Sequence, residues 1–178
     1  MFFSEFLKHP ELKKAFGSRP DNFSRELRRF GELPYRKPGR GGDGVVTADE
    51  AAKLICTLCA ATSVANIPNA IELYNSKGHD TPTILDLVKK AIQEGTADFE
   101  QIDFELNQER CYIIWASDIG HFSKIERNPD RINPNGRLVP SEHKPRSSDN
   151  FIAVRIMKSR FLELLHHEIN PTSAKPKH

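Results

Sequence analysis

The N-terminal half of the chain spaces its apolar residues as amphipathic helices do, and prolines and glycines interrupt the pattern. Residues 2–16 are predicted to form two short helices, because Pro10 lacks an N–H donor and suits the first turn of a helix better than its middle. In the next helix, which Asp21 or Ser24 could cap, three apolar residues share one face at helical spacing: Phe23, Leu27 and Phe30. The chain is therefore expected to begin with three short helices.

The next helix is predicted to be the centre of the helical core. Thr47 and Glu50 stand three residues apart, the spacing of a capping box, so a helix of about residues 48–62 is expected to begin there. Its residues are apolar on nearly every side, which is typical of a buried helix. Two further helices are expected, one after Pro68 and one that begins at Pro82 and stops at Gly95.

The pattern changes to alternation after residue 98. Ile102, Phe104 and Leu106 alternate with polar residues, the period of a half-buried strand, and residues 111–115 continue as a second strand of an antiparallel hairpin. Residues 118–150 contain four prolines and are expected to be one long irregular connection. A third strand is predicted at 151–157, followed by an amphipathic helix at 160–169.

Together these elements predict an α+β fold in two parts. Residues 1–97 form a helical unit, residues 98–170 form a small antiparallel sheet with a C-terminal helix, and residues 171–178 are a disordered tail. Two short helices, a turn that contains glycine and a third helix with a basic outer side resemble a helix-turn-helix over roughly residues 2–35. The resemblance is one of architecture, and no diagnostic motif accompanies it.

Charge is unevenly distributed along the 178 residues, although the net charge is only +2. Residues 1–46 hold 10 Lys and Arg against 6 Asp and Glu, a net charge of +4. Residues 47–109 hold 4 against 11, a net charge of −7, and residues 110–178 hold 12 against 7, a net charge of +5. Such blocks indicate separate surfaces with separate partners, or acidic and basic parts that face each other inside the fold.

The strongest candidate for a binding site is the basic stretch of residues 19–46. Arginine donates two hydrogen bonds in one plane to a phosphate group, and a glycine-rich loop can follow a phosphate backbone. The stretch predicts a nucleic-acid-binding protein, with duplex DNA as its partner and regulation as its role. The residues expected to carry binding are three helix arginines, Arg25, Arg28 and Arg29, and four loop residues, Tyr35, Arg36, Lys37 and Arg40.

The same loop matches a dinucleotide-binding pattern by its glycines alone. Gly39, Gly41 and Gly44 have the spacing G-x-G-x-x-G, but that motif requires a buried strand before it. Pro34 and Pro38 exclude a central strand there, because proline cannot donate to the ladder of a sheet. We therefore expect no nucleotide cofactor.

No catalytic motif stands out, and the sequence predicts a protein that is not an enzyme. Cys56 and Cys59 form C-x-x-C inside the predicted core helix, where they are expected to be buried and inert rather than metal ligands. A weaker hypothesis places a metal-dependent nuclease site in the polar stretch that contains Asp118, His121, Glu126 and Asp130. The odd number of cysteines, Cys111 being the third, favours a cytoplasmic location.

The acidic segment of residues 47–109 supports an alternative function, a protein-binding adaptor or inhibitor that presents this surface to a basic partner. The C-terminal sheet would also suit a homodimer interface. The sequence contains no run of 18 apolar residues, and its opening residues lack the order of a signal peptide, so no membrane partner is expected.

Overall fold

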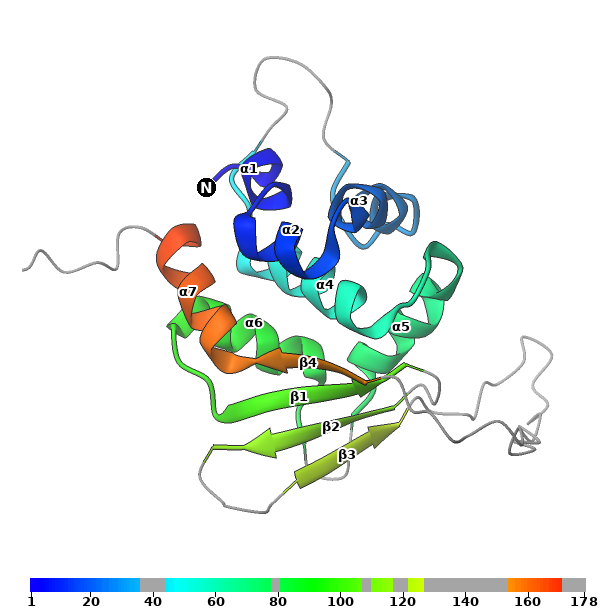
Figure 1. Cartoon of the computed structure of the whole chain (residues 1–178), viewed down its shortest axis with the longest axis vertical. Helices are drawn as coiled ribbons and strands as arrows, with labels where there is room; N and C mark the ends of the chain where they lie inside the picture. The colour runs from blue at the N-terminus through cyan, green and yellow to red at the C-terminus, as the bar shows by residue number, and fades with distance from the viewer. Residues whose placement is uncertain (36–43, 78–80, 107–109, 117–121, 127–153, 171–178) are drawn as a thin grey trace, which may run out of the picture.

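The computed structural model describes residues 1–35, 44–77, 81–106, 110–116, 122–126 and 154–170. The described elements are, in chain order, α1 (Phe3–Leu7), α2 (Pro10–Phe16), α3 (Arg19–Arg29), α4 (Ala48–Ala60), η1 (Val64–Asn66), α5 (Ile67–Asn75), α6 (Ile84–Glu94), β1 (Phe99–Glu105), β2 (Arg110–Trp115), β3 (Phe122–Glu126), β4 (Val154–Lys158) and α7 (Ser159–Ile169). The helices lie on one side of a single sheet, with α1, α2 and α3 farthest from it (Figure 1). The predicted α+β class, with a helical N-terminal part, is confirmed.

The first three helices begin and end close to the predicted positions. Pro10 starts α2, and the side chain of His9 caps that helix by accepting a hydrogen bond from the Glu11 N–H at 3.2 Å. Gly17 follows α2 with φ +62°, a conformation that glycine adopts without strain. Ser18 is the N-cap of α3, in place of Asp21 or Ser24, and Pro20 in the first turn fixes a helical φ there.

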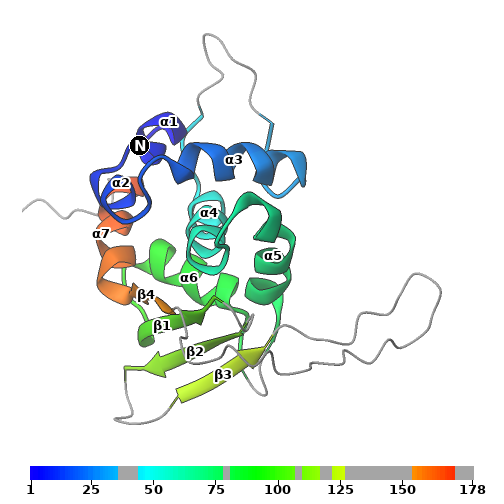
Figure 2. The same ribbon diagram turned by 45° about the vertical axis from the view of Figure 1, so that its right-hand side comes forward.

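Helix α4 is the central helix, as predicted. The Thr47 hydroxyl accepts from the Glu50 N–H at 3.2 Å, and the Glu50 carboxylate accepts from the Thr47 N–H at 2.8 Å, which confirms the capping box. Leu54, Ile55 and Leu58 are completely buried. Helices α3, α5 and α6 pack around α4, and the sheet covers its remaining side (Figure 2).

The sheet has four antiparallel strands in the order β3-β2-β1-β4. Ile102 of β1 pairs with Ile113 of β2 and with Met157 of β4, and all three are buried against the helices. Strand β3 lies inside the stretch 118–150 that was expected to be irregular, so that prediction is wrong for these five residues. Strand β3 has only five residues and is stabilised by its pairing with β2. So few residues show little alternation of apolar and polar side chains in the sequence.

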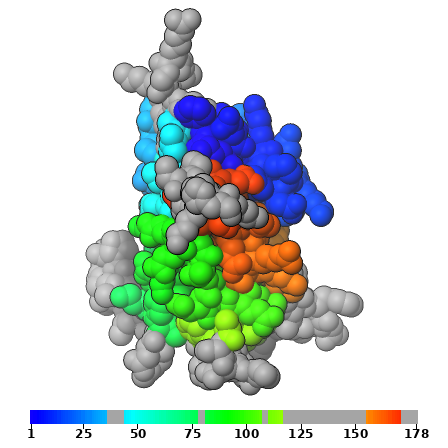
Figure 3. Space-filling view, turned by 90° about the vertical axis from the view of Figure 1, so that its left-hand side faces the viewer, coloured from blue at the N-terminus to red at the C-terminus, as the bar shows by residue number. Residues whose placement is uncertain are grey.

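The sheet and the helices share one hydrophobic core, which runs from Leu12 in α2 through α4 to Phe104 in β1 and Leu162 in α7. Helix α7 joins the two predicted parts of the chain. Its Glu168 carboxylate lies 3.0 Å from the Nε2 atom of His9, and its surface adjoins both the N-terminal helices and the sheet part (Figure 3). The helical part and the sheet part therefore pack as one body.

The contact between α7 and α6 leaves no space for a side chain at residue 95. The Nδ1 atom of His166 donates a hydrogen bond to the Ile92 carbonyl at 2.9 Å, and the imidazole ring lies directly over Gly95. A Cβ atom at Gly95 would stand 2.7 Å from that ring, and the φ of +72° is one that L-residues rarely adopt. Glycine is therefore required at the end of α6, where the sequence pattern predicted a stop.

Among the described residues, no single helix has the length and apolar character needed to cross a membrane. Helix α4 and the segment Val64–Asn75 reach that length and composition only when taken together, and the chain bends by 113° between them.

Candidate nucleic-acid interface

Helix α3 presents two arginines to solvent on the side away from α4. Phe23 and Leu27 are buried beneath the helix, and the side chains of Arg25 and Arg29 are 65% and 75% exposed. These two arginines stand four residues apart and so share one face. Their outward position agrees with the amphipathic pattern in the sequence.

Each exposed arginine already has a carboxylate partner in its own helix. Arg25 donates from Nη2 to Asp21 Oδ2 at 2.5 Å, and Arg29 donates from Nη1 to Glu26 Oε1 at 2.6 Å. Ion pairs at exposed positions contribute only about 0–1 kcal/mol, because water and salt screen them and both side chains lose freedom. The local charge of this face is therefore close to zero, while its arginines stay easily available to another anion.

Arg28 does not project with Arg25 and Arg29. Its guanidinium carbon lies 5.0 Å from the ring centre of Phe3 in α1, a cation–π contact. Its Nε atom is buried without a hydrogen-bond partner in the described part of the protein. Arg28 therefore contributes to the packing of α1 on α3, whereas Arg25 and Arg29 are the exposed arginines of this helix.

Two aromatic residues at the end of α3 are exposed. The sequence pattern placed Phe30 on the buried face, but α3 ends at Arg29, and Phe30 is its C-cap with 50% exposure. Tyr35 is 79% exposed, so its ring is accessible for the nucleic-acid contact that the sequence predicts. The three loop residues Arg36, Lys37 and Arg40 lie outside the described residues.

Both stems of this loop are anchored beside α1 and α3. Leu33 is buried before the loop and Val46 is buried after it. The Val46 N–H donates to the Met1 carbonyl at 3.1 Å, and the Phe3 N–H donates to the Gly44 carbonyl at 3.1 Å. The exposed face of α3 and the two stems of the basic loop therefore lie at the end of the molecule farthest from the sheet (Figure 2).

A second pair of arginines, which no pattern in the sequence indicated, lies at the C-terminal end of α4. Arg19 of α3 donates from Nη2 to the Ala61 carbonyl at 2.6 Å. Arg155 of β4 donates from Nη1 to the carbonyls of Leu58 at 2.7 Å and of Ala61 at 2.6 Å. The two residues are far apart in the chain, so only the packing of β4 against α4 brings them together.

The acidic segment uses much of its charge in pairs within the molecule. Asp49 lies 3.3 Å from the ammonium group of Lys53 and 3.1 Å from that of Lys89. Partial burial raises the pKa of Asp49, but the hydrogen bonds from these two lysines outweigh it and hold the pKa below its usual value. Two more acidic residues are paired in the same way, Asp98 with Lys90 and Glu105 with Arg110.

The three cysteines are free and buried, as the sequence predicted for the C-x-x-C pair. Burial raises the pKa of Cys56 well above its usual value, and it raises the pKa values of Cys59 and Cys111 to about 12. The positive charges of Arg155 and Arg19 oppose this rise at Cys59. At neutral pH these thiols are protonated and poor nucleophiles.

The described residues contain no cluster of three or more His, Cys, Asp or Glu side chains that could hold a metal ion. Of the four residues in the nuclease hypothesis, Asp118, His121 and Asp130 lie outside the described residues. Glu126 is the last residue of β3, at the register position opposite Arg110. The nuclease hypothesis therefore stays a prediction from the sequence.

The chain is an α+β protein with one exposed arginine face and one half-buried arginine pair. Comparison of the sequence with protein-family models and with curated proteins, and of the structure with solved structures, finds no match.

Proposed function

We propose that the protein binds nucleic acid, with duplex DNA as the partner and regulation as the role, through α3 and the loop that follows it. The observation that carries the proposal is the exposed pair Arg25 and Arg29, one helical turn apart on α3. Tyr35, which is also exposed, follows six residues after the helix ends. These residues belong to a segment, residues 1–46, whose net charge is +4.

Arginines that are already paired with carboxylates can bind DNA if a phosphate group replaces the carboxylate. The carboxylates of Asp21 and Glu26 hold Arg25 and Arg29 only weakly, because both pairs are exposed. A phosphate group accepts two parallel hydrogen bonds from a guanidinium group, and contact with it releases condensed counterions from the DNA. In this proposal, the intrahelical pairs hold the arginines extended along the surface until phosphate replaces the carboxylate.

The loop supplies the remaining positive charge. Arg36, Lys37 and Arg40 enter the proposal through the sequence alone. The stem before them is hydrogen-bonded to α3 through Leu27, and the stem after them is hydrogen-bonded to Met1 and Phe3. Helix arginines that reach base edges would give sequence preference, whereas lysine and arginine on a glycine-rich loop would contact phosphates of any sequence. The proposed role requires no cofactor and no catalytic residue.

The alternative function, an adaptor or inhibitor that binds a basic protein through residues 47–109, has weaker support. Three of its acidic residues, Asp49, Asp98 and Glu105, are already paired with cations of this molecule. A basic partner would have to displace those cations. A homodimer that uses the sheet is compatible with either proposal.

A salt series in gel-shift assays tests the proposal with duplex DNA, single-stranded DNA and RNA. We expect log K to fall with log salt by about 0.9 for each phosphate contact on duplex DNA, and each alanine substitution to lower that slope by about 1. The helix variant is R25A/R29A, and the loop variant is R36A/K37A/R40A. The matched control is K90A/R160A, which removes two exposed cations from α6 and α7.

The variant that combines all five substitutions decides the outcome. We expect it to lose binding to every probe, while the control keeps the affinity and slope of the wild type. If the five-residue variant is folded by circular dichroism and binds duplex DNA with unchanged affinity and slope, the basic face is only a solvated surface and the proposal is wrong.

A further inference from the structure

The two arginines at the C-terminal end of α4 converge on one oxygen atom. Arg19 and Arg155 both donate to the Ala61 carbonyl, each at 2.6 Å, so their guanidinium groups lie close together. They arrive from different elements, Arg19 from the first turn of α3 and Arg155 from β4. Both side chains are partly exposed rather than enclosed in the core.

This pair has no carboxylate partner in the part of the chain that the structure describes, in contrast to Arg25, Arg29 and Arg110. Partial burial lowers the pKa of both Arg19 and Arg155, and the charge of Arg155 lowers the pKa of Arg19 further. The partial negative charge at the end of α4 offsets only part of the two positive charges. An anion at this position would be stabilised by both.

The two guanidinium groups retain hydrogen-bonding capacity after they have capped α4. Each has five N–H donors in one plane. The hydrogen bonds to described residues come from a single nitrogen of each group, Nη2 of Arg19 and Nη1 of Arg155. The remaining donors form the kind of fork that binds phosphate or carboxylate with two parallel hydrogen bonds.

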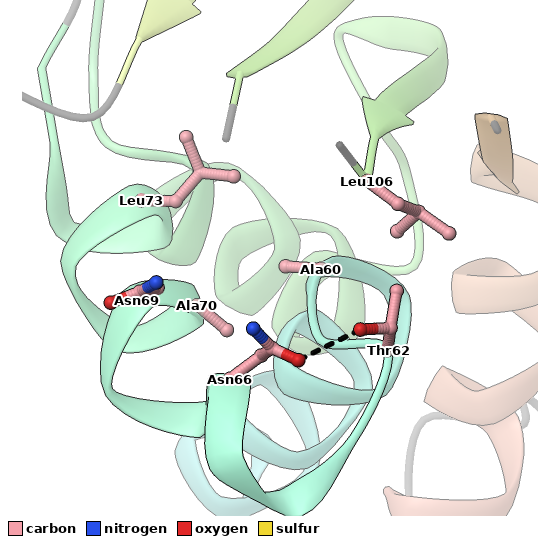
Figure 4. Close-up of a pocket in the computed structure, with 7 residues that line it drawn as sticks. All are labelled: Ala60, Thr62, Asn66, Asn69, Ala70, Leu73 and Leu106. Carbon is pink, nitrogen blue, oxygen red and sulfur yellow. Dashed lines mark hydrogen bonds between the residues drawn. The ribbon is translucent and has the colours of Figure 1, made fainter. Parts of the chain in front are cut away.

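The turn that follows Ala61 adds neutral polar groups. Thr62 and Ser63 donate from their hydroxyls to the amide oxygen of Asn66, at 2.8 Å and 2.7 Å. With its oxygen occupied, Asn66 turns its amide nitrogen toward the open pocket between the end of α4, α5 and the end of β1 (Figure 4). Neither Arg19 nor Arg155 is among the residues that line this pocket, so the turn adjoins the arginine pair without completing its binding site.

We propose that Arg19 and Arg155, held together at the Ala61 carbonyl, form an oxyanion-binding site with a phosphate group as the ligand. The ligand chemistry is a tetrahedral phosphate group, free or as an ester, held by the two guanidinium forks. The site lies away from the exposed face of α3, and it does not depend on the proposed nucleic-acid binding. The carbonyls of α4 keep the two arginines in place when the site is empty.

Thermal unfolding in inorganic phosphate tests the site, with sodium chloride at equal ionic strength as the reference. A ligand that binds only the folded protein raises Tm with the logarithm of its concentration above Kd. We expect phosphate to raise the Tm of the protein. We also expect the ³¹P resonance of phosphate to broaden when the protein is added. In R19K/R155K, which keeps both charges but loses the planar forks, the affinity should fall about tenfold or more.

The variant R160K is the matched control, because it makes the same change at an exposed arginine of α7 outside both proposed sites, and it should respond to phosphate as the wild type does. If R19K/R155K is too unstable to measure, the single variant R19K, which keeps the three carbonyl contacts of Arg155, replaces it. A wild type without any phosphate-specific rise in Tm, or a full rise in the lysine variant, would overturn the proposal and leave the two arginines as helix caps.

Competition identifies the source of the phosphate group. Adenosine 5′-monophosphate and an oligonucleotide without terminal phosphates are each titrated against the ³¹P signal of bound inorganic phosphate. Displacement by the monophosphate supports a free phosphorylated metabolite, and displacement by the oligonucleotide supports a backbone phosphate. If neither displaces phosphate, the site does not accept phosphate esters, and the proposal is wrong in its ligand class.

Discussion

Two pairs of arginines, Arg25 with Arg29 and Arg19 with Arg155, differ in what holds them. The first pair is exposed on α3, and each member binds a carboxylate in the same helix. The second pair is half-buried, binds main-chain carbonyls at the end of α4 and has no carboxylate partner among the described residues. The exposed pair can be found in the sequence, because both of its arginines lie in one short basic stretch. The half-buried pair cannot, because its arginines come from distant segments that meet only when the protein folds.

This difference has consequences for stability and for binding. Exposed ion pairs contribute little to folding and exchange readily with a larger anion, so Arg25 and Arg29 suit reversible contact with a polyanion. Hydrogen bonds from charged groups to partly buried carbonyls contribute more, so Arg19 and Arg155 have a structural role whether or not an anion binds. Substitutions in and around the two pairs should therefore differ in their effects on stability and on binding.

The largest effect should come from the helix that both arginine pairs adjoin. Leu54 in α4 is completely buried, so Leu54→Ala should lower the free energy of unfolding by roughly 2–5 kcal/mol through lost apolar burial and a residual cavity. Urea unfolding followed by circular dichroism measures the change. An unchanged urea midpoint would show that α4 is not the buried centre of both regions.

Removal of Arg155 should cost more stability than removal of Arg25. Arg155→Ala deletes hydrogen bonds to carbonyls at the end of α4, and we expect a loss of about 1.5–3 kcal/mol. Arg25→Ala deletes an exposed ion pair and should change stability by about 0.5 kcal/mol or less. The loss of stability for Arg155→Lys should lie between the losses for Arg155→Ala and Arg25→Ala. Equal costs for the two alanine variants would remove the distinction between the arginine pairs.

Thiol labelling reports on the same end of α4. Cys59 is buried with a pKa of about 12, so roughly one thiol in ten thousand is ionised at pH 8 and the native protein should not react with a disulfide reagent. All three cysteines should react after denaturation. Arg155→Ala should speed the labelling of Cys59, because it loosens the carbonyls around it. Rapid labelling of the native wild type would contradict the burial described above.

The acidic segment should show the smallest effect. The pKa of Asp49 is lowered in the folded protein, so its contribution to stability is present above the unfolded pKa of about 3.9 and is lost as pH falls through the lower folded value. The side chain is 38% exposed, which reduces the contribution through screening by solvent. Urea midpoints between pH 5 and pH 3 should fall less steeply in Asp49→Asn than in the wild type. Identical slopes would show that Lys53 and Lys89 do not stabilise the carboxylate.

Much of the helical part could be predicted from the sequence because its signals are local. Pro10, the pair Thr47 and Glu50, and Gly95 each act within one turn of helix, and the structure contains the expected break, cap and stop. Strand β3 could not be predicted, because its order comes from pairing with β2 rather than from a periodic pattern.

The candidate site was predictable only in part, for the same reason. Helical spacing placed Arg25 and Arg29 on the exposed face correctly, but it could not show that Phe3 of another helix would hold Arg28. Phe30 had the right spacing for burial, yet the helix ended before it. Arg19 and Arg155 meet only in the folded protein, so no sequence window contains both.

The most direct test of the account compares two double variants against two ligands. R25A/R29A and R19K/R155K are each titrated with a DNA duplex and, separately, with inorganic phosphate, beside the wild type. We expect R25A/R29A to lose duplex binding and its salt dependence but to keep the phosphate-dependent rise in Tm. We expect R19K/R155K to lose that rise but to keep duplex binding. If one variant loses both ligands while the other keeps both, the molecule has a single anion-binding surface, and the division between the two arginine pairs is wrong.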